Sequence, residues 1–139
     1  MEIRAFHTSD ESKVIALWQA CNLTRPWNDP HQDIARKLTV QPELFVVGIE
    51  ENQLIASAMF GFEGHRGWVN YLAVDPAHQH KGHASTLMQW GEEAMKARGC
   101  PKINLQVRSS NAAVIAFYQS LGYGVDDVTS LGKRLIADA

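Results

Sequence analysis

Residues 68–84 combine a short apolar strand, a glycine-containing loop and the start of a helix. The run Trp68–Val74 is closed by Asp75-Pro76, and the loop Gln79–Ala84 leads directly into an amphipathic helix. Backbone N–H groups at a helix start have no intrahelical partner, and the helix dipole makes that end partly positive. Gly82 lets the backbone close around an anion, so this segment suits a phosphate or pyrophosphate group.

Two well-known phosphate-binding loops do not fit this spacing. A Walker loop places its lysine after the second glycine, whereas Lys81 precedes Gly82. A dinucleotide-binding loop needs three spaced glycines, and only Gly82 lies between Val74 and Met88. A single glycine is weak evidence, so a plain connection between a strand and a helix remains an open interpretation of this segment alone.

A second segment, Val107–Tyr123, is more specific. It contains Asn111 before a helical run, Phe117-Tyr118 within the run and Leu121-Gly122-Tyr123 at its end. Each part also has a structural interpretation, because asparagine caps helix starts and glycine ends helices. Together with the Gln79–Ala84 loop, however, this segment resembles the GNAT superfamily of N-acetyltransferases. It is especially similar to members that acetylate the N-termini of ribosomal proteins.

The resemblance covers nearly the whole chain and implies both a fold and an activity. The implied fold is the GNAT fold of the α/β (α+β) class, formed by one domain over residues 1–139. Its mixed central sheet of about six or seven strands would be splayed in the middle and flanked by about four helices. The implied reaction is direct acetyl transfer from acetyl-coenzyme A to a primary amine on a small molecule, a lysine or a protein N-terminus. A non-catalytic acyl-coenzyme A sensor or interaction module is the alternative.

The resemblance also implies roles for individual residues. The strands ending at Val74 and starting at Ile103 would splay apart, so that the backbone of Leu72, Ala73 and Val74 could bond the pantetheine arm. The Leu72 N–H would stabilise the oxyanion, and Tyr118 would protonate the departing thiolate as the general acid. Asn111 would bond pantetheine, and the pyrophosphate would be held by the loop residues Gln79, His80, Lys81, Gly82, His83, Ala84 and Ser85.

The general base does not follow from the resemblance. Many relatives carry a glutamate where this chain has Trp68 or Gln106, and neither of these side chains can take up a proton. Glu63 and His65 lie at a hairpin tip, roughly 20 Å along the strand from Leu72 at about 3.3 Å per residue. We therefore expect an ordered water as proton acceptor, or an amine that arrives already deprotonated.

Four polar or aromatic residues are candidates for the acceptor side of the site. Asn70 and Gln106 could hold that water, although both could equally be sheet residues that face solvent. Trp27 and Asn28 lie between the first two helices, a connection that commonly borders the acceptor pocket in this family. The alternative is an exposed loop that is anchored by one buried tryptophan.

The histidines and cysteines do not form a metal-binding pattern. His78, His80 and His83 lie on the phosphate loop without an acidic or thiol partner, so solvation or contact with coenzyme phosphates is expected. No metal cofactor is predicted. Cys21 and Cys100 match neither a metal spacing nor a disulfide framework, and we expect free thiols with no catalytic part.

The N-terminal half predicts elements that position these residues. A strand over Glu2–Ala5 precedes a helix through about Asn22, which a capping box of Thr8 and Glu11 would start. Asp29-Pro30 predicts the start of a second helix, with an aspartate cap and proline in the first position. Strands are predicted over 44–50 and 54–62 around a tight turn, and over 68–74 after a turn at residues 64 and 65.

The C-terminal half continues the alternation of helices and strands. The helix after the phosphate loop should end at Arg98-Gly99, a strand should cover Ile103–Val107, and a helix should cover Asn111–Leu121. Two short strands are predicted around Tyr123–Val128 and Ser130–Leu135. The resulting order, β-α-α-β-β-β-α-β-α-β-β, is that of the GNAT fold.

Composition limits the remaining function classes. The chain has 139 residues, of which 45% are hydrophobic, and this suits one compact domain with a core. A net charge of −2 argues against nucleic acid as the main partner. No apolar run approaches the roughly 20 residues of a membrane span, and no leader is apparent, so no membrane partner is expected. We expect a cytoplasmic protein that is a monomer or a homodimer.

Overall fold

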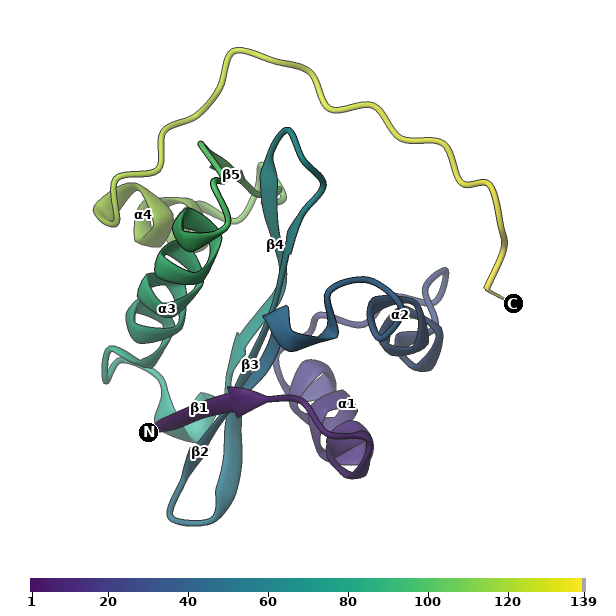
Figure 1. The fold of residues 1–139 in the computed structure, drawn as a ribbon, viewed down its shortest axis with the longest axis vertical. Helices are drawn as coiled ribbons and strands as arrows, with labels where there is room; N and C mark the ends of the chain where they lie inside the picture. The colour runs from purple at the N-terminus through teal and green to yellow at the C-terminus, as the bar shows by residue number, and fades with distance from the viewer. Residues whose placement is uncertain (139) are drawn as a thin grey trace.

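The computed structural model describes residues 1–138, which form a five-stranded sheet flanked by helices (Figure 1). The strands are β1 (Glu2–Ala5), β2 (Phe45–Glu50), β3 (Gln53–Phe62), β4 (Gly67–Val74) and β5 (Ile103–Asn104). The helices are α1 (Glu11–Ala20), α2 (Pro30–Lys37), α3 (His83–Ala97) and α4 (Ala112–Ser120), with 3-10 turns at Thr8–Asp10, Pro42–Leu44 and Pro76–His78. None of the helices in this part of the chain is both long and apolar enough to cross a membrane.

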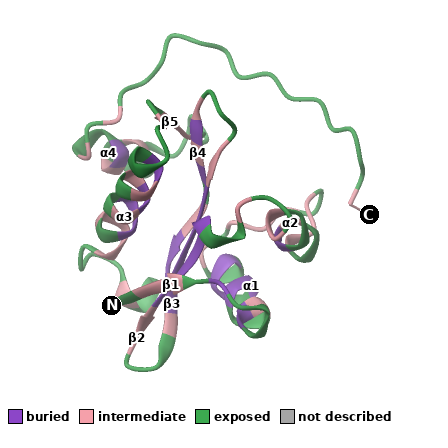
Figure 2. Cartoon of the chain, in the orientation of Figure 1, coloured by how far each residue is buried: buried purple, intermediate pink, exposed green. Residues whose placement is uncertain are grey.

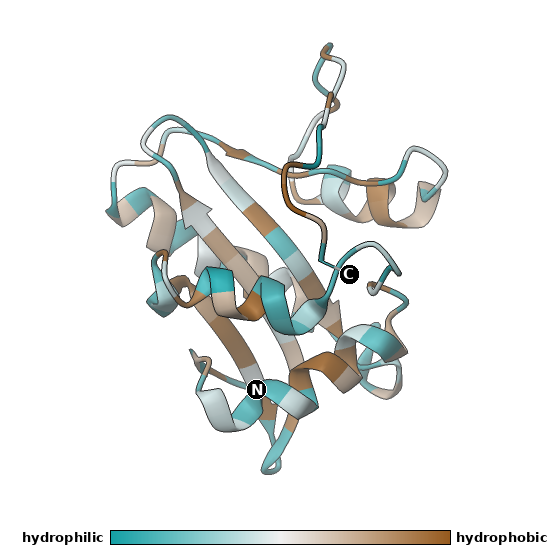
Figure 3. Cartoon of the chain, turned by 90° about the vertical axis from the view of Figure 1, so that its right-hand side faces the viewer, coloured by the Kyte–Doolittle hydropathy of each residue, from teal (hydrophilic) through white to brown (hydrophobic). Residues whose placement is uncertain are grey.

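The two faces of the sheet carry separate hydrophobic cores. Helices α1 and α2 cover one face, and α3 and α4 cover the other (Figure 1). Successive side chains of a strand point to opposite faces. In β2, Val46 accordingly packs in the core under α3, whereas Phe45 and Val47 pack in the core under α1. Figure 2 shows that the buried residues are concentrated on the strands and on the helix sides that face them, and Figure 3 shows apolar residues along the same elements.

The first four strands form a meander of antiparallel neighbours. The predicted turn between β2 and β3 is confirmed: Glu51 and Asn52 both adopt positive φ, at 50° and 63°. Strand β5 runs parallel to β4, because helix α3 makes the crossover between them. The pairing of β4 with β5 is short, since it joins only Gly67 to Ile103 and Trp68 to Asn104. Beyond these pairs the two strands separate, as the resemblance to the GNAT superfamily implied.

Strand β4 contains a bulge a few residues beyond its pairing with β5. Ser57 pairs with Ala73 and Met59 with Asn70, so two residues of β4 oppose one residue of β3. Tyr71 adopts φ of 52° in this bulge, which is unusual for a residue with a side chain. Its ring stacks on Trp18 with 3.8 Å between ring centroids. The bulge is therefore supported by packing from helix α1.

The prediction of two C-terminal strands was wrong. Their absence explains why the sheet has five strands rather than about six or seven. The two strands predicted at 123–128 and 130–135 do not form, and the segment is extended without a backbone ladder. Side-chain contacts hold it beside β5 instead: Lys102 pairs with Asp126 at 2.8 Å, and Gln106 bonds Ser130. A strand needs a partner with free backbone groups, and β5 is only two residues long.

Some element boundaries also differ from the predictions. The capping box of Thr8 and Glu11 was wrong, because Thr8–Asp10 forms a 3-10 turn in which the Asp10 carboxylate accepts the His7 N–H at 2.9 Å. Helix α1 ends at Ala20, just before Asn22, which takes φ of 57°. The predicted cap at Asp29 is confirmed, since its carboxylate accepts the His31 N–H at 2.9 Å.

Gly91 lets helix α3 approach the sheet closely, and its replacement tests this packing. A Cβ at Gly91 would lie 2.1 Å from an atom of the buried Phe60 ring. We expect Gly91→Ala to lower the free energy of unfolding by about 1–3 kcal/mol, although alanine favours helices by about 1 kcal/mol over glycine. Urea unfolding measures the effect, with Glu93→Ala at an exposed position of α3 as the control. Unchanged stability of Gly91→Ala would contradict this account of the packing.

Candidate active site

The opening between β4 and β5 continues into a cleft of about 830 Å³. Three stretches of chain line this cleft: the connection between α1 and α2, residues 69–72 of β4, and the connection between β5 and α4. Tyr118 of α4 also lines it. The cleft therefore joins elements from both faces of the sheet at the point where the sheet splays.

Alternate backbone groups near the end of β4 face the opening toward β5. The Asp75 N–H bonds the Ile55 carbonyl at 2.7 Å, so residue 75 faces β3, and the pairing of Ala73 with Ser57 faces the same way. Alternate residues of a strand direct their backbone groups to opposite sides. The N–H and C=O groups of Val74, and across the bulge those of Leu72, therefore face the opening toward β5.

The Val74 carbonyl is engaged by two side chains. It accepts the Gln79 side-chain amide at 3.0 Å and the Cys21 thiol at 3.3 Å. Burial raises the pKa of the Cys21 thiol, which favours the protonated form that donates this bond. Cys21 lies just after α1 rather than within its apolar stripe, and it is half-buried.

The predicted phosphate loop ends at the first turn of α3. His80 and Gly82 take positive φ, at 64° and 83°, and the first helical bond runs from the Thr86 N–H to the Gly82 carbonyl at 3.0 Å. Within residues 1–138, the backbone N–H groups of Gln79 to Ser85 have no hydrogen-bond acceptor. These free donors at the positive end of a 15-residue helix have the properties of an anion site.

The loop histidines do not gather around a common point. His83 Nε2 lies 3.6 Å from a carboxylate oxygen of Glu50, whereas His78 Nδ1 lies 3.8 Å from Asp75. Both nitrogens are buried and lack a hydrogen-bond partner within the described chain. No group of three or more metal-ligating side chains occurs in residues 1–138.

Tyr118 is the titratable residue that the sequence singled out as a general acid. It is 8% exposed, and its burial raises its pKa to about 12. Its ring makes edge contacts with Phe117 and Tyr123, at 5.1 Å and 5.7 Å between centroids. Its hydroxyl has no partner among the described residues, whereas the Tyr123 hydroxyl donates to Glu92 at 2.7 Å. The Tyr118 hydroxyl therefore stays protonated near neutral pH, and Tyr118 lines the cleft.

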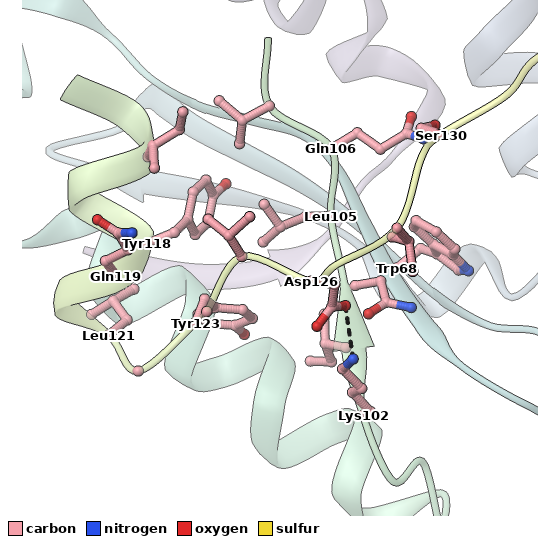
Figure 4. A pocket seen from close by; sticks show the side chains of 18 of the residues that line it. Trp68, Lys102, Leu105, Gln106, Tyr118, Gln119, Leu121, Tyr123, Asp126 and Ser130 are labelled. Carbon is pink, nitrogen blue, oxygen red and sulfur yellow. Dashed lines mark hydrogen bonds and ion pairs between the residues drawn. The ribbon is translucent and has the colours of Figure 1, made fainter. Parts of the chain in front are cut away.

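Gln106 and Asn111 flank the same cleft from the β5 side. The Gln106 amide nitrogen donates to Ser130 of the C-terminal segment, and both side chains meet beside β5 (Figure 4). This bond leaves the Gln106 carbonyl oxygen as an acceptor. The Asn111 oxygen caps α4 by accepting the Val114 N–H at 3.4 Å, which leaves its amide nitrogen as the donor for a ligand.

The acceptor-side candidates lie on the cleft, but one interpretation of them was wrong. Trp27, Asn28 and Asn70 all line the cleft. Trp27 is 54% exposed, so it is not a buried anchor of its loop. The Asn28 side chain accepts a hydrogen bond from Arg134, which brings the C-terminal segment to the rim of the cleft.

Glu63 is unsuited to act as a base. It lies outside the cleft lining, at the tip of the hairpin between β3 and β4. Hydrogen bonds from the backbone N–H groups of Arg66 and His65 hold the pKa of its carboxyl below the usual range. The carboxylate is therefore both distant and weakly basic.

Two features of the site were missed in the sequence. Asp33 of α2 accepts the Tyr71 hydroxyl at 2.6 Å, and both residues line the cleft. Asp138, near the chain end, accepts the Asp29 N–H at 2.9 Å and pairs with Arg36. Contacts across 38 and 109 residues of sequence leave no periodic signal, so local patterns could not reveal them.

Comparison with known proteins places this arrangement in a family. The model of the acetyltransferase (GNAT) family matches residues 12–123. An acetyltransferase of Yersinia enterocolitica is 49% identical over 138 residues, which cover 99% of this chain and 98% of the relative.

Two solved structures show the same fold. Ard1 from Thermoplasma volcanium has a TM-score of 0.81 at 22% identity and covers 90% of this chain and 83% of its own. The ribosomal-protein-S18-alanine N-acetyltransferase from Escherichia coli has a TM-score of 0.72 at 25% identity, with coverage of 87% and 76%. The family match and the near-complete relative agree with the splayed sheet and its loop, and this chain belongs to the GNAT family of acetyltransferases.

Proposed function

We propose that this acetyltransferase transfers an acetyl group from acetyl-coenzyme A directly to a primary amine that enters the cleft. The observation that carries the proposal is the meeting of two unused donors in one cleft. The backbone of Leu72 faces away from β3, and the hydroxyl of Tyr118 has no partner in residues 1–138. A thioester in the cleft would use one donor for its oxygen and the other for its sulfur.

The coenzyme would bind along the seam between the two halves of the sheet. The free amides from Gln79 to Ser85 support binding of its pyrophosphate. The backbone groups of Leu72 and Val74 support pairing with its pantetheine arm, which the Asn111 amide can also contact. Pairing at Val74 displaces the Gln79 side chain from the Val74 carbonyl.

The proposed reaction balances without a covalent intermediate on the protein. The amine nitrogen forms a bond to the acetyl carbon, and the Leu72 N–H stabilises the oxyanion that results. Collapse of the oxyanion breaks the carbon–sulfur bond, and the thiolate takes the Tyr118 proton. The surplus proton of the amine leaves through water at Asn70 or Gln106, and Tyr118 regains a proton from solvent.

Replacement of Tyr118 tests the general acid. Tyr118→Phe removes only the hydroxyl, so we expect unchanged acetyl-coenzyme A binding and turnover lower by about 10²-fold. Release of free coenzyme A measures turnover, and calorimetry measures binding. Tyr123→Phe is the matched control, because Tyr123 contacts Tyr118 but its hydroxyl bonds Glu92. Full activity of Tyr118→Phe would show that Tyr118 is not the general acid. If the wild-type protein binds acetyl-coenzyme A but shows no turnover, a non-catalytic binding module would be favoured instead.

The pH dependence tests the absence of a side-chain base. Tyr118, with a pKa raised to about 12, stays protonated through neutral and moderately alkaline pH. We therefore expect the rate to rise with pH toward the pKa of the acceptor amine, without an inflection near 6.5, the usual histidine value. Gln106→Glu should raise activity at lower pH by supplying a carboxylate base. An inflection near 6.5 in the wild type would indicate that a histidine is the base.

Replacement of Gly82 tests the phosphate loop, and replacement of Gly64, which also has a positive φ, is the control. Gly82 and Gly64 both have positive φ, and a Cβ at either position would meet no atom within 4 Å. Gly82→Ala and Gly64→Ala should therefore cost about the same backbone strain, roughly 1 kcal/mol each. Only Gly82→Ala should weaken acetyl-coenzyme A binding, as measured by thermal-shift titration. Equal coenzyme affinity of the two variants would contradict the loop assignment.

A further inference from the structure

The lining of the cleft carries an excess of positive charge. Arg25 lines it from the connection between α1 and α2, and Arg108 lines it from the connection between β5 and α4. The one carboxylate in the lining, Asp33, already accepts the Tyr71 hydroxyl at 2.6 Å and Arg36 at 3.2 Å. This excess of positive charge is local to the cleft, since the chain as a whole has a net charge of −2.

Both arginines lack a charged partner in the described chain. Arg25 donates through one guanidinium nitrogen to the carbonyls of Asn22 and Thr24, at 2.7 Å and 2.8 Å. These bonds fix its orientation without neutralising it. The Arg108 side chain is exposed and makes no hydrogen bond or ion pair within residues 1–138. A guanidinium whose orientation is already fixed loses less entropy when it binds an anion.

We infer that the amine acceptor is a small molecule with a carboxylate, which Arg25 and Arg108 bind while its amine reaches the thioester. This inference rests on the proposed acetyl transfer. The planar guanidinium group matches a carboxylate in shape and charge. The coenzyme phosphates are not the anions in question, because the loop Gln79–Ser85 does not line this cleft.

The dimensions of the cleft favour a small acceptor. Its volume of about 830 Å³, which the acceptor would share with the thioester end of the coenzyme, lies in the range of small-molecule sites, roughly 300–1,000 Å³. The C-terminal segment reaches the rim through the bond from Arg134 to Asn28. Trp27, which is exposed on the same rim, offers an apolar face for the methylene groups between amine and carboxylate.

The test compares a ladder of straight-chain ω-amino acids with the matching ω-amino amides, which differ in charge but hardly in size. For wild-type protein we expect kcat/KM, measured as release of free coenzyme A, to be about 10-fold or more higher for the best amino acid than for its amide. Arg25→Gln and Arg108→Gln should each remove most of this preference through a higher KM, with the amides and acetyl-coenzyme A unaffected. Arg66→Gln is the control, because Arg66 also bonds a backbone carbonyl but lies outside the cleft.

Several outcomes would overturn the inference. Equal turnover of amino acids and amides would do so, as would a preference that survives both cleft variants or turnover of acidic peptides alone. Weaker acetyl-coenzyme A binding in Arg25→Gln or Arg108→Gln would assign the arginines to the coenzyme instead.

A calorimetric arm separates this inference from the proposed function. If none of the acceptors leads the wild-type protein to release coenzyme A, the proposed acetyl transfer has failed. In that case the ω-amino acids are titrated into protein that is loaded with coenzyme A. Binding of the acids but not the amides, lost in Arg25→Gln, would still support the carboxylate site. Absence of binding would overturn it.

Discussion

The candidate active-site cleft depends on one buried chain of hydrogen bonds that supports the bulge in β4. The Trp18 indole N–H donates to the Ser57 hydroxyl at 2.9 Å, and that hydroxyl donates to the Tyr71 carbonyl at 3.2 Å. Ser57 is fully buried, so its hydroxyl would be costly without these two partners. With them, the strained φ of Tyr71 is held in place, and the next residue, Leu72, turns its backbone toward the opening.

The same bulge attaches strand β4 to the two helices on one face of the sheet. The Tyr71 ring stacks on Trp18 of α1, and its hydroxyl bonds Asp33 of α2, so both helices are attached to the strand that contains the proposed oxyanion donor. Burial and the Asp33 contact raise the pKa of Tyr71, which keeps its hydroxyl a hydrogen-bond donor. On the opposite face, α3 approaches closely through Gly91 and carries the free amides of the phosphate loop. The two proposed substrate regions are therefore attached to the same sheet, one through β4 and the other through the packing of α3 on β3.

The C-terminal segment has a sequence pattern typical of strands but does not pair with the sheet. It extends from α4 past β5 toward α2, and most of its residues are exposed (Figures 1 and 2). Its large apolar side chains at Val125, Val128, Leu131, Leu135 and Ile136 stay in contact with solvent. The segment is held by side chains at both ends, through Lys102 at one and Arg36 at the other. Its contacts with Gln106 and Asn28 bring it to the edge of the cleft.

The sequence by itself determined the elements whose signals are local. The cap at Asp29, the turn at Glu51 and Asn52 and the glycine loop before α3 each depend on a few neighbouring residues, and all are present in the structure. The GNAT assignment followed from such motifs because their spacing along the chain is itself informative.

Only the tertiary structure decided which distant residues meet. Strand β5 is short because β4 diverges from it after Trp68, and the predicted C-terminal strands have no ladder to join. Arg25 and Arg108 are 83 residues apart in the chain, yet they line one cleft. Neighbouring residues constrain local backbone angles, whereas the pairing of strands and the set of residues that line one cleft depend on how the whole chain packs.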